Sequence, residues 1–113
     1  MIDYEKLQLI KNSAILINTA RGGLIVEDDL IKALQTKEIL GAGLDVFESE
    51  PSRADHPFYD MENVILSPHM AGTDHLSLEE MGIEAAQCII DLYKGNWPDQ
   101  CVVNGDLKKG WDW

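Results

Sequence analysis

A chain of 113 residues with 45% apolar and 26% charged residues has the composition of one small globular domain. Its net charge of −11, without any cluster of lysines and arginines, argues against a nucleic-acid surface and against binding to anionic membranes. We expect a cytoplasmic protein, because the sequence shows neither a membrane-spanning apolar run nor a secretion signal.

The N-terminal part of the chain predicts a helix, a strand and a second helix. Asp3 is placed to cap a short helical stretch that ends near Asn12, and the apolar run over residues 13–18 is typical of a buried parallel strand. Two glycines then turn the chain. The second helix begins near Glu27 with three acidic residues, which the helix dipole favours. Its apolar stripe consists of Leu30, Ala33 and Leu34.

The rest of the chain predicts two further strands and one long helix. Residues 41–47 and 63–67 are the strands, and the segment between them, with its prolines and acids, is expected to be a surface loop. Thr73 or Asp74 can cap a helix that ends near Lys94. One face of this helix carries an apolar stripe for which core packing is expected: Leu78, Met81, Ala85, Ile89 and Tyr93.

The order of these elements predicts an α/β fold that is half of a doubly wound, Rossmann-like parallel sheet with flanking helices. Residues 1–95 contain the elements, and residues 96–113 read as an irregular tail whose tryptophans need a surface to pack on. No G-x-G-x-x-G turn follows a strand, so the turn that cradles dinucleotide phosphates is absent from the sequence. Half a sheet exposes an edge and a face without helices, from which we predict self-association.

Three stretches at the predicted strand ends carry chemically active side chains: residues 18–23 (NTARGG), 44–51 (LDVFESEP) and 67–72 (SPHMAG). Ligands of open α/β sheets bind outside the carboxyl ends of the strands, so Arg21, Glu50 and His69 are expected to converge there. A guanidinium matches a carboxylate with two parallel hydrogen bonds, and an imidazole exchanges protons near neutral pH. These residues therefore form a candidate site that binds an anion and moves a proton.

In order and spacing, these motifs resemble the C-terminal half of the NAD-binding domain of the D-isomer-specific 2-hydroxyacid dehydrogenases, a family with phosphoglycerate, glycerate and D-lactate dehydrogenases. The resemblance covers about residues 1–104. It implies an oxidoreductase that transfers hydride between NAD, or NADP, and a small 2-hydroxy or 2-keto acid. It also implies that the chain is the distal part of a larger homodimeric enzyme, inactive alone, with residues 96–113 packed on the absent substrate domain.

The resemblance implies a role for each motif residue. Arg21 would anchor the substrate, His69 would act as the acid/base, and Glu50 would orient His69. Glu48 is a rival of Glu50 by proximity. Asp45 would accept a hydrogen bond from the nicotinamide carboxamide, although donors from the protein would satisfy it equally. The cofactor contacts implied in this way are Thr19, Ala20, Arg21, Asp45, His69, Met70, Ala71 and Gly72.

A second interpretation is a non-catalytic half-domain that acts as a binding or assembly module and retains the three residues as a relic. A metal hydrolase is disfavoured because no two histidines have metal-ligand spacing, so no metal site is expected. His56 and His75 match no motif and are expected to be exposed. Val26 departs from the resembled family, many members of which carry an aspartate there as a helix cap; this departure bears on helix stability.

Overall fold

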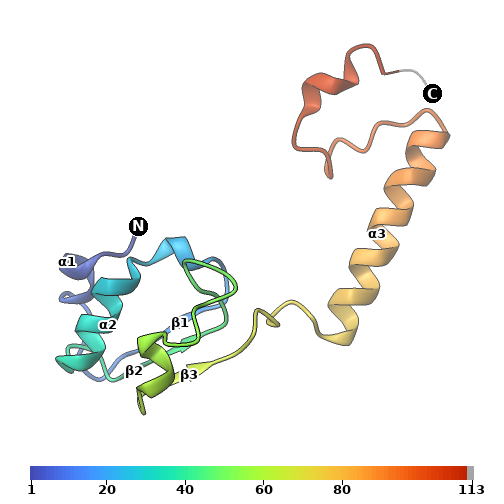
Figure 1. Ribbon diagram of the computed structural model, residues 1–113. Coiled ribbons are helices and arrows are strands. Elements are labelled where there is room, and N and C mark those ends of the chain that lie inside the picture. Colours follow the sequence, from blue (N-terminus) through green and yellow to red (C-terminus); the bar gives the residue numbers. More distant parts are fainter. Residues whose placement is uncertain (112–113) are drawn as a thin grey trace. The chain divides into compact units, whose positions relative to one another are not determined.

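The computed structural model describes residues 1–111 and contains two compact units (Figure 1). The first unit is Met1–Ala71 and contains all three strands found among residues 1–111, and the second begins at Gly72. All predicted site residues except Gly72 belong to the first unit, so this unit carries the candidate site. The assignment of residues 1–95 to one domain of the complete protein stays a prediction.

The first unit is built on a parallel sheet, as predicted. The strands β1 (Ile15–Asn18), β2 (Gly41–Leu44) and β3 (Val64–Leu66) lie in the order β1-β2-β3. Their registers pair Ile17 with Gly43 and Gly43 with Ile65. All three strands run in the same direction, so the loops that follow them emerge at one edge of the sheet (Figure 1).

One face of this sheet is covered by helices α1 (Tyr4–Leu7) and α2 (Glu27–Gln35). The predicted stripe of α2 is buried there, and its apolar side chains meet those of the central strand. The buried core of the unit consists of Leu7, Ile25, Leu30, Ala33, Leu34, Ile39, Ala42, Leu44 and Phe58. Burial of this stripe confirms the amphipathic helix predicted between the first two strands.

The opposite face of the sheet has no helix within the first unit. Ile15 and Ile17 of β1 are 62% and 72% exposed, and Ile65 of β3 is 78% exposed. Side chains alternate between the two faces along a strand, which is why these isoleucines share the uncovered side. Within the first unit this face carries no helix, as predicted, and the self-association inferred from it stays a prediction.

The segment between β2 and β3 differs from the predicted surface loop. It contains a 3-10 helix, Pro57–Asp60, whose Phe58 is 1% exposed and belongs to the core. The loop is thus anchored to the core, which fixes the residues on either side of the 3-10 helix.

Helix α1 ends at Leu7 and not near Asn12 as predicted. Asp3 caps this helix as predicted, because its side chain accepts the Lys6 N–H.

The second unit consists of α3 (His75–Tyr93) and the segment after it. Asp74 caps α3 by accepting the Ser77 N–H at 3.1 Å, and Gly95 follows it with a φ of 78°, as a helix end often requires. The expected core packing of the α3 stripe is wrong within this unit: Leu78, Met81, Ala85, Ile89 and Tyr93 are all exposed. The segment after α3 contributes too few side chains to cover a helix of this length.

The predicted irregular tail contains one short 3-10 helix, Gly105–Lys108. Two of its tryptophans pack on each other, because the Trp97 and Trp111 rings meet edge to face with centroids 5.6 Å apart. Trp113 lies outside the described residues. Among residues 1–111, no helix has both the length and the apolar character that crossing a membrane requires.

Helix α2 begins without a side-chain cap, since Val26 stands at its N-cap and makes no capping hydrogen bond. Val26→Thr keeps the shape of the side chain and adds a hydroxyl that can accept a free N–H of the first turn. We expect the free energy of unfolding to rise by about 0.5–1 kcal/mol, measured by urea denaturation. Val26→Ala, which adds no acceptor, is the control; a threonine variant no more stable than the wild type would contradict this assignment.

Candidate active site

The three residues singled out by the sequence meet at one cavity. Arg21, Glu50 and His69 follow the carboxyl ends of β1, β2 and β3, respectively, and border a cavity of about 200 Å³. Each comes from a different strand end, so the parallel sheet is what brings them together. The cavity has room for a small organic acid and offers it one guanidinium and one imidazole.

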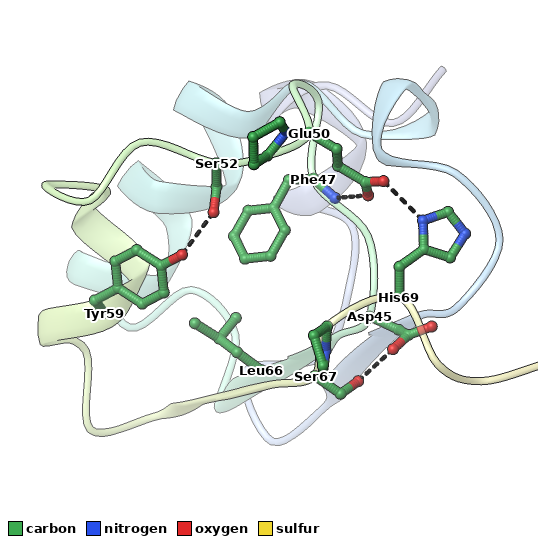
Figure 2. Close-up of a pocket in the computed structure, with 10 residues that line it drawn as sticks. Asp45, Phe47, Glu50, Ser52, Tyr59, Leu66, Ser67 and His69 are labelled. Atoms are coloured by element: carbon green, nitrogen blue, oxygen red, sulfur yellow. Dashed lines mark hydrogen bonds and ion pairs between the residues drawn. The ribbon is translucent and has the colours of Figure 1, made fainter. Parts of the chain in front are cut away.

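The imidazole of His69 is paired with a carboxylate. Glu50 Oε2 lies 2.7 Å from His69 Nδ1, and Glu50 Oε1 accepts the Phe47 N–H at 2.9 Å (Figure 2). The Phe47 amide, and after it His69, lower the pKa of Glu50 below its usual value; the charge of Arg21 acts in the same direction. Glu50, rather than Glu48, is therefore the carboxylate that holds His69, and it leaves Nε2 for other contacts.

His69 occupies the left-handed region of backbone space, with a φ of 56°. This conformation costs a residue with a Cβ about 1–2 kcal/mol, so neighbouring contacts have to hold it. The contacts come from Asp45, which accepts Ser67 Oγ at 2.5 Å, Met70 N at 2.8 Å and Ala71 N at 2.8 Å. Asp45 thus binds the segment on both sides of His69.

Asp45 is 3% exposed and lies directly after β2. The Ser67 hydroxyl, and then the Met70 and Ala71 amides, lower the pKa of its carboxyl. The sequence had indicated that a buried aspartate needs donors, and the protein itself supplies three of them. Its predicted contact with nicotinamide stays a prediction, to which the structure adds a role in positioning His69.

Arg21 is exposed, and its Nη1 donates to the Ala20 carbonyl at 2.6 Å. Among residues 1–111, no carboxylate lies within 4.0 Å of its guanidinium, so that part of the chain offers it no salt bridge. Asn18 fixes the turn: its amide donates to the Arg21 carbonyl at 2.9 Å and accepts the Ala20 N–H at 3.1 Å. This role of Asn18 is not among those predicted from the sequence, although asparagine commonly bonds the backbone two residues on.

The predicted cofactor contacts lie at two strand ends. Thr19 and Ala20 are exposed after β1, and Met70 and Ala71 are exposed after β3. Gly72 is the first residue of the second unit and is exposed there. Their contact with a cofactor stays a prediction. Among residues 1–111, no group of three or more histidine, cysteine or acidic side chains is arranged to hold a metal ion.

Gly22 lies after β1, and its backbone contacts the loop that follows β2 and carries Glu50. A Cβ at this position would lie 1.9 Å from the Phe47 carbonyl oxygen and 2.4 Å from the Glu48 nitrogen, so only glycine allows this backbone contact. A Cβ at Gly23, by contrast, would meet no atom within 4 Å. The first glycine of the motif is therefore a structural requirement of the site, and the second is not.

A second, larger cavity of about 480 Å³ also borders the Glu50–His69 pair (Figure 2). Phe47, Tyr59 and Leu66 give it apolar walls, and Ser52 Oγ is 2.5 Å from the Tyr59 hydroxyl. The Glu50–His69 pair borders both cavities, of which the larger has these apolar walls and the smaller is bordered by Arg21.

The expected exposure of His56 is wrong, whereas His75 is exposed as expected. His56 is 8% exposed, and its Nε2 lies 3.1 Å from Glu27 Oε2. His56 is buried because the 3-10 helix that follows it anchors the loop to the core through Phe58.

Comparison with known proteins adds a family match. Residues 1–71 match the family described as D-isomer specific 2-hydroxyacid dehydrogenase, NAD binding domain. The chain is 42% identical over 109 residues to a glyoxylate reductase of Korarchaeum cryptofilum, covering 96% of this chain and 32% of that protein. It is 41% identical over 102 residues to glyoxylate/hydroxypyruvate reductase B of Cronobacter sakazakii, covering 90% and 32%, respectively.

The fold is similar to that of solved dehydrogenases. The NAD-complexed D-isomer specific 2-hydroxyacid dehydrogenase from Lactobacillus delbrueckii ssp. bulgaricus matches with a TM-score of 0.81 and 36% identity, over 92% of this chain and 35% of that one. The NADPH-dependent glyoxylate/hydroxypyruvate reductase from Sinorhizobium meliloti, in complex with citrate, matches with a TM-score of 0.75 and 32% identity, over 81% and 29%. The chain thus spans about a third of the length of these proteins, and the Rossmann-like fold predicted from the sequence is confirmed.

Gly22→Ala is expected to destabilise the protein by at least about 1–3 kcal/mol, because the new methyl group would overlap backbone atoms that cannot move independently. Gly23→Ala is the matched control, since its methyl group meets open space. Urea denaturation of both variants measures the difference. Equal losses of stability would show that the Gly22 contact does not constrain the site.

Asp45→Asn is expected to weaken the dependence of stability on acid. A carboxyl whose folded pKa lies below its usual 3.8 stabilises the fold above that pH, and this contribution disappears as the pH falls through the lower folded pKa. Urea denaturation at about pH 7 and about pH 3 should therefore show a smaller acid-induced loss in the variant than in the wild type. The exposed Asp60→Asn is the control, and an unchanged acid dependence in Asp45→Asn would refute the assignment.

Proposed function

The chain belongs to the D-isomer specific 2-hydroxyacid dehydrogenase family through its NAD binding domain, and on this premise we propose that the complete protein is an NAD(P)-dependent oxidoreductase. It interconverts a small 2-hydroxy acid and the corresponding 2-keto acid. The observation that carries the proposal is the cavity of about 200 Å³ at which Arg21, Glu50 and His69 meet.

Arg21 binds the carboxylate of the substrate in this proposal. Its guanidinium faces the cavity without a carboxylate partner within 4.0 Å among residues 1–111, so an incoming acid displaces no salt bridge there. Two parallel hydrogen bonds to the carboxylate orient the adjacent keto group. In a chain with a net charge of −11, the Arg21 guanidinium offers a small anion a localised positive charge at a strand end.

His69 moves the proton. It gives a proton from Nε2 to the keto oxygen in reduction and accepts the hydroxyl proton in oxidation. Glu50 holds Nδ1 at 2.7 Å, which fixes the orientation of the ring and stabilises its protonated form. Because Glu50 is itself held by the Phe47 amide, the pair is already arranged before a substrate binds.

The bound nicotinamide supplies or accepts the hydride. Thr19, Ala20, Arg21 and the segment from His69 to Gly72 are the proposed contacts, because they follow the carboxyl ends of the strands. Asp45 fits a contact with the carboxamide, since its Oδ2 accepts only the Ala71 N–H among the bonds described and an oxygen of a carboxylate accepts two. The same contacts suit NAD and NADP.

Glyoxylate and hydroxypyruvate are the proposed substrates. The support is the names of the relatives, which are glyoxylate reductases and glyoxylate/hydroxypyruvate reductases, together with the small size of the cavity. The proposed setting is a cytoplasmic homodimer, as the family resemblance implies. The acidic net charge supports the proposal that it binds neither nucleic acid nor an anionic membrane.

The test is oxidation of NADH and NADPH by the complete protein with glyoxylate, hydroxypyruvate, pyruvate and phosphohydroxypyruvate. His69→Ala should lower kcat by roughly 10²- to 10⁴-fold, because the reaction loses its proton donor. Arg21→Lys should raise KM by roughly 10- to 100-fold, because an ammonium cannot replace the forked pair of hydrogen bonds. His75→Ala and Arg53→Lys are matched controls on exposed residues and should leave both constants unchanged.

The outcomes separate the two interpretations of the motif residues. Turnover that disappears in His69→Ala but not in His75→Ala would support the dehydrogenase. Binding of NADH without turnover on any of the four acids would favour the non-catalytic module, in which the three residues are a relic.

A further inference from the structure

The first unit contains a second histidine–carboxylate pair besides Glu50–His69. His56 Nε2 lies 3.1 Å from Glu27 Oε2, and the two side chains are only 10% and 17% exposed. The Phe58 N–H donates to His56 Nδ1 at 3.4 Å, so Nδ1 accepts and Nε2 carries the hydrogen that is donated to Glu27. A buried pair with this defined arrangement needs an explanation, because polar groups are costly to bury.

The pair is connected to the candidate site through two successive backbone amides, those of Phe47 and Glu48. Glu27 Oε1 accepts the Glu48 N–H at 2.9 Å, and Glu50 Oε1 accepts the Phe47 N–H at 2.9 Å. Two adjacent backbone amides are therefore bound by two different carboxylates. Each of these carboxylates uses its other oxygen to hold a histidine, His56 in one case and His69 in the other.

Packing strengthens the same connection. The His56 ring meets the Phe47 ring edge to face, with centroids 5.4 Å apart, and lies 4.9 Å from the Phe58 ring. His56 therefore supports the side chain of the residue whose amide binds Glu50. The backbone of Gly22 closes the opposite side of Phe47 and Glu48.

We propose that Glu27 and His56 are positioning residues of the reaction: they hold the Phe47–Glu48 peptide so that Glu50 stays fixed on His69 Nδ1. The inference rests on the proposed function and adds two residues to it. Neither residue borders the cavity of about 200 Å³, so they act through Glu50 and not on the substrate.

The test uses the complete protein and two matched pairs of variants. Glu27→Gln and Asp28→Asn each remove one negative charge from the first turn of α2, but only Glu27 bonds Glu48 and His56. His56→Gln keeps an amide N–H near the place of Nε2, whereas His56→Leu keeps only bulk. His56→Gln is also the milder change if His56→Leu fails to fold.

Glu27→Gln and His56→Leu should lower kcat for 2-keto acid reduction by roughly 10- to 100-fold at nearly unchanged KM, since the acid/base pair is displaced while Arg21 is not. A purely structural role would lower the amount of folded enzyme and leave kcat and KM unchanged per folded molecule, and this difference separates the two roles. His56→Gln should restore most of the activity, and Asp28→Asn should match the wild type.

The results distinguish the two proposals. A wild-type protein without turnover on any 2-keto acid overturns the proposed function, and the positioning role that rests on it. An active wild type with Glu27→Gln equal to Asp28→Asn in kcat and KM per folded molecule overturns the positioning role alone. Amide hydrogen exchange at Phe47 and Glu48 gives a readout that is independent of activity. We expect exchange to be faster in Glu27→Gln than in Asp28→Asn.

Discussion

The buried carboxylate of Asp45 is the interaction on which the geometry of the site depends. A charge that is 3% exposed is tolerated because three donors from the segment after β3 bind it. The same bonds hold His69 in a left-handed conformation that its own side chain does not favour. One set of hydrogen bonds therefore offsets both the desolvation of Asp45 and the backbone strain of His69.

Carboxylates hold backbone N–H groups of the loops at more than one place in the first unit. Glu27, Asp45 and Glu50 each accept backbone N–H groups of the loops that follow the strands. The strands themselves are three or four residues long, so the ladder of the sheet cannot fix the loops beyond it. The acidity of the chain, which the sequence presents as a matter of solubility, is thus partly structural: several of its negative charges hold the loops in place.

The sequence predicts those features that depend on periodicity and strand ends. The parallel strands, the stripe of α2 and the convergence of Arg21, Glu50 and His69 follow from such patterns. The Asn18 and Ser67 contacts were missed because they depend on loop conformation, which short polar residues do not reveal by themselves. The burial of His56 was missed for a different reason: its partner Glu27 is 29 positions away, on another element. The α3 stripe shows the reverse error, since periodicity predicts an apolar face but not what covers it.

The hydrogen bonds described here for Arg21, Glu50 and His69 all lie between Asn18 and His69, so the arrangement of the three residues is local to the first unit. Within the proposed function, Arg21 binds the carboxylate and His69 the keto oxygen, two groups that all 2-keto acids share. A guanidinium and an acid/base pair fixed in this way treat these acids alike at the reacting end. Discrimination among substrates must then come from groups that contact the remainder of the molecule, where a site that hydrogen-bonds a substrate hydroxyl can reject an analogue that lacks it.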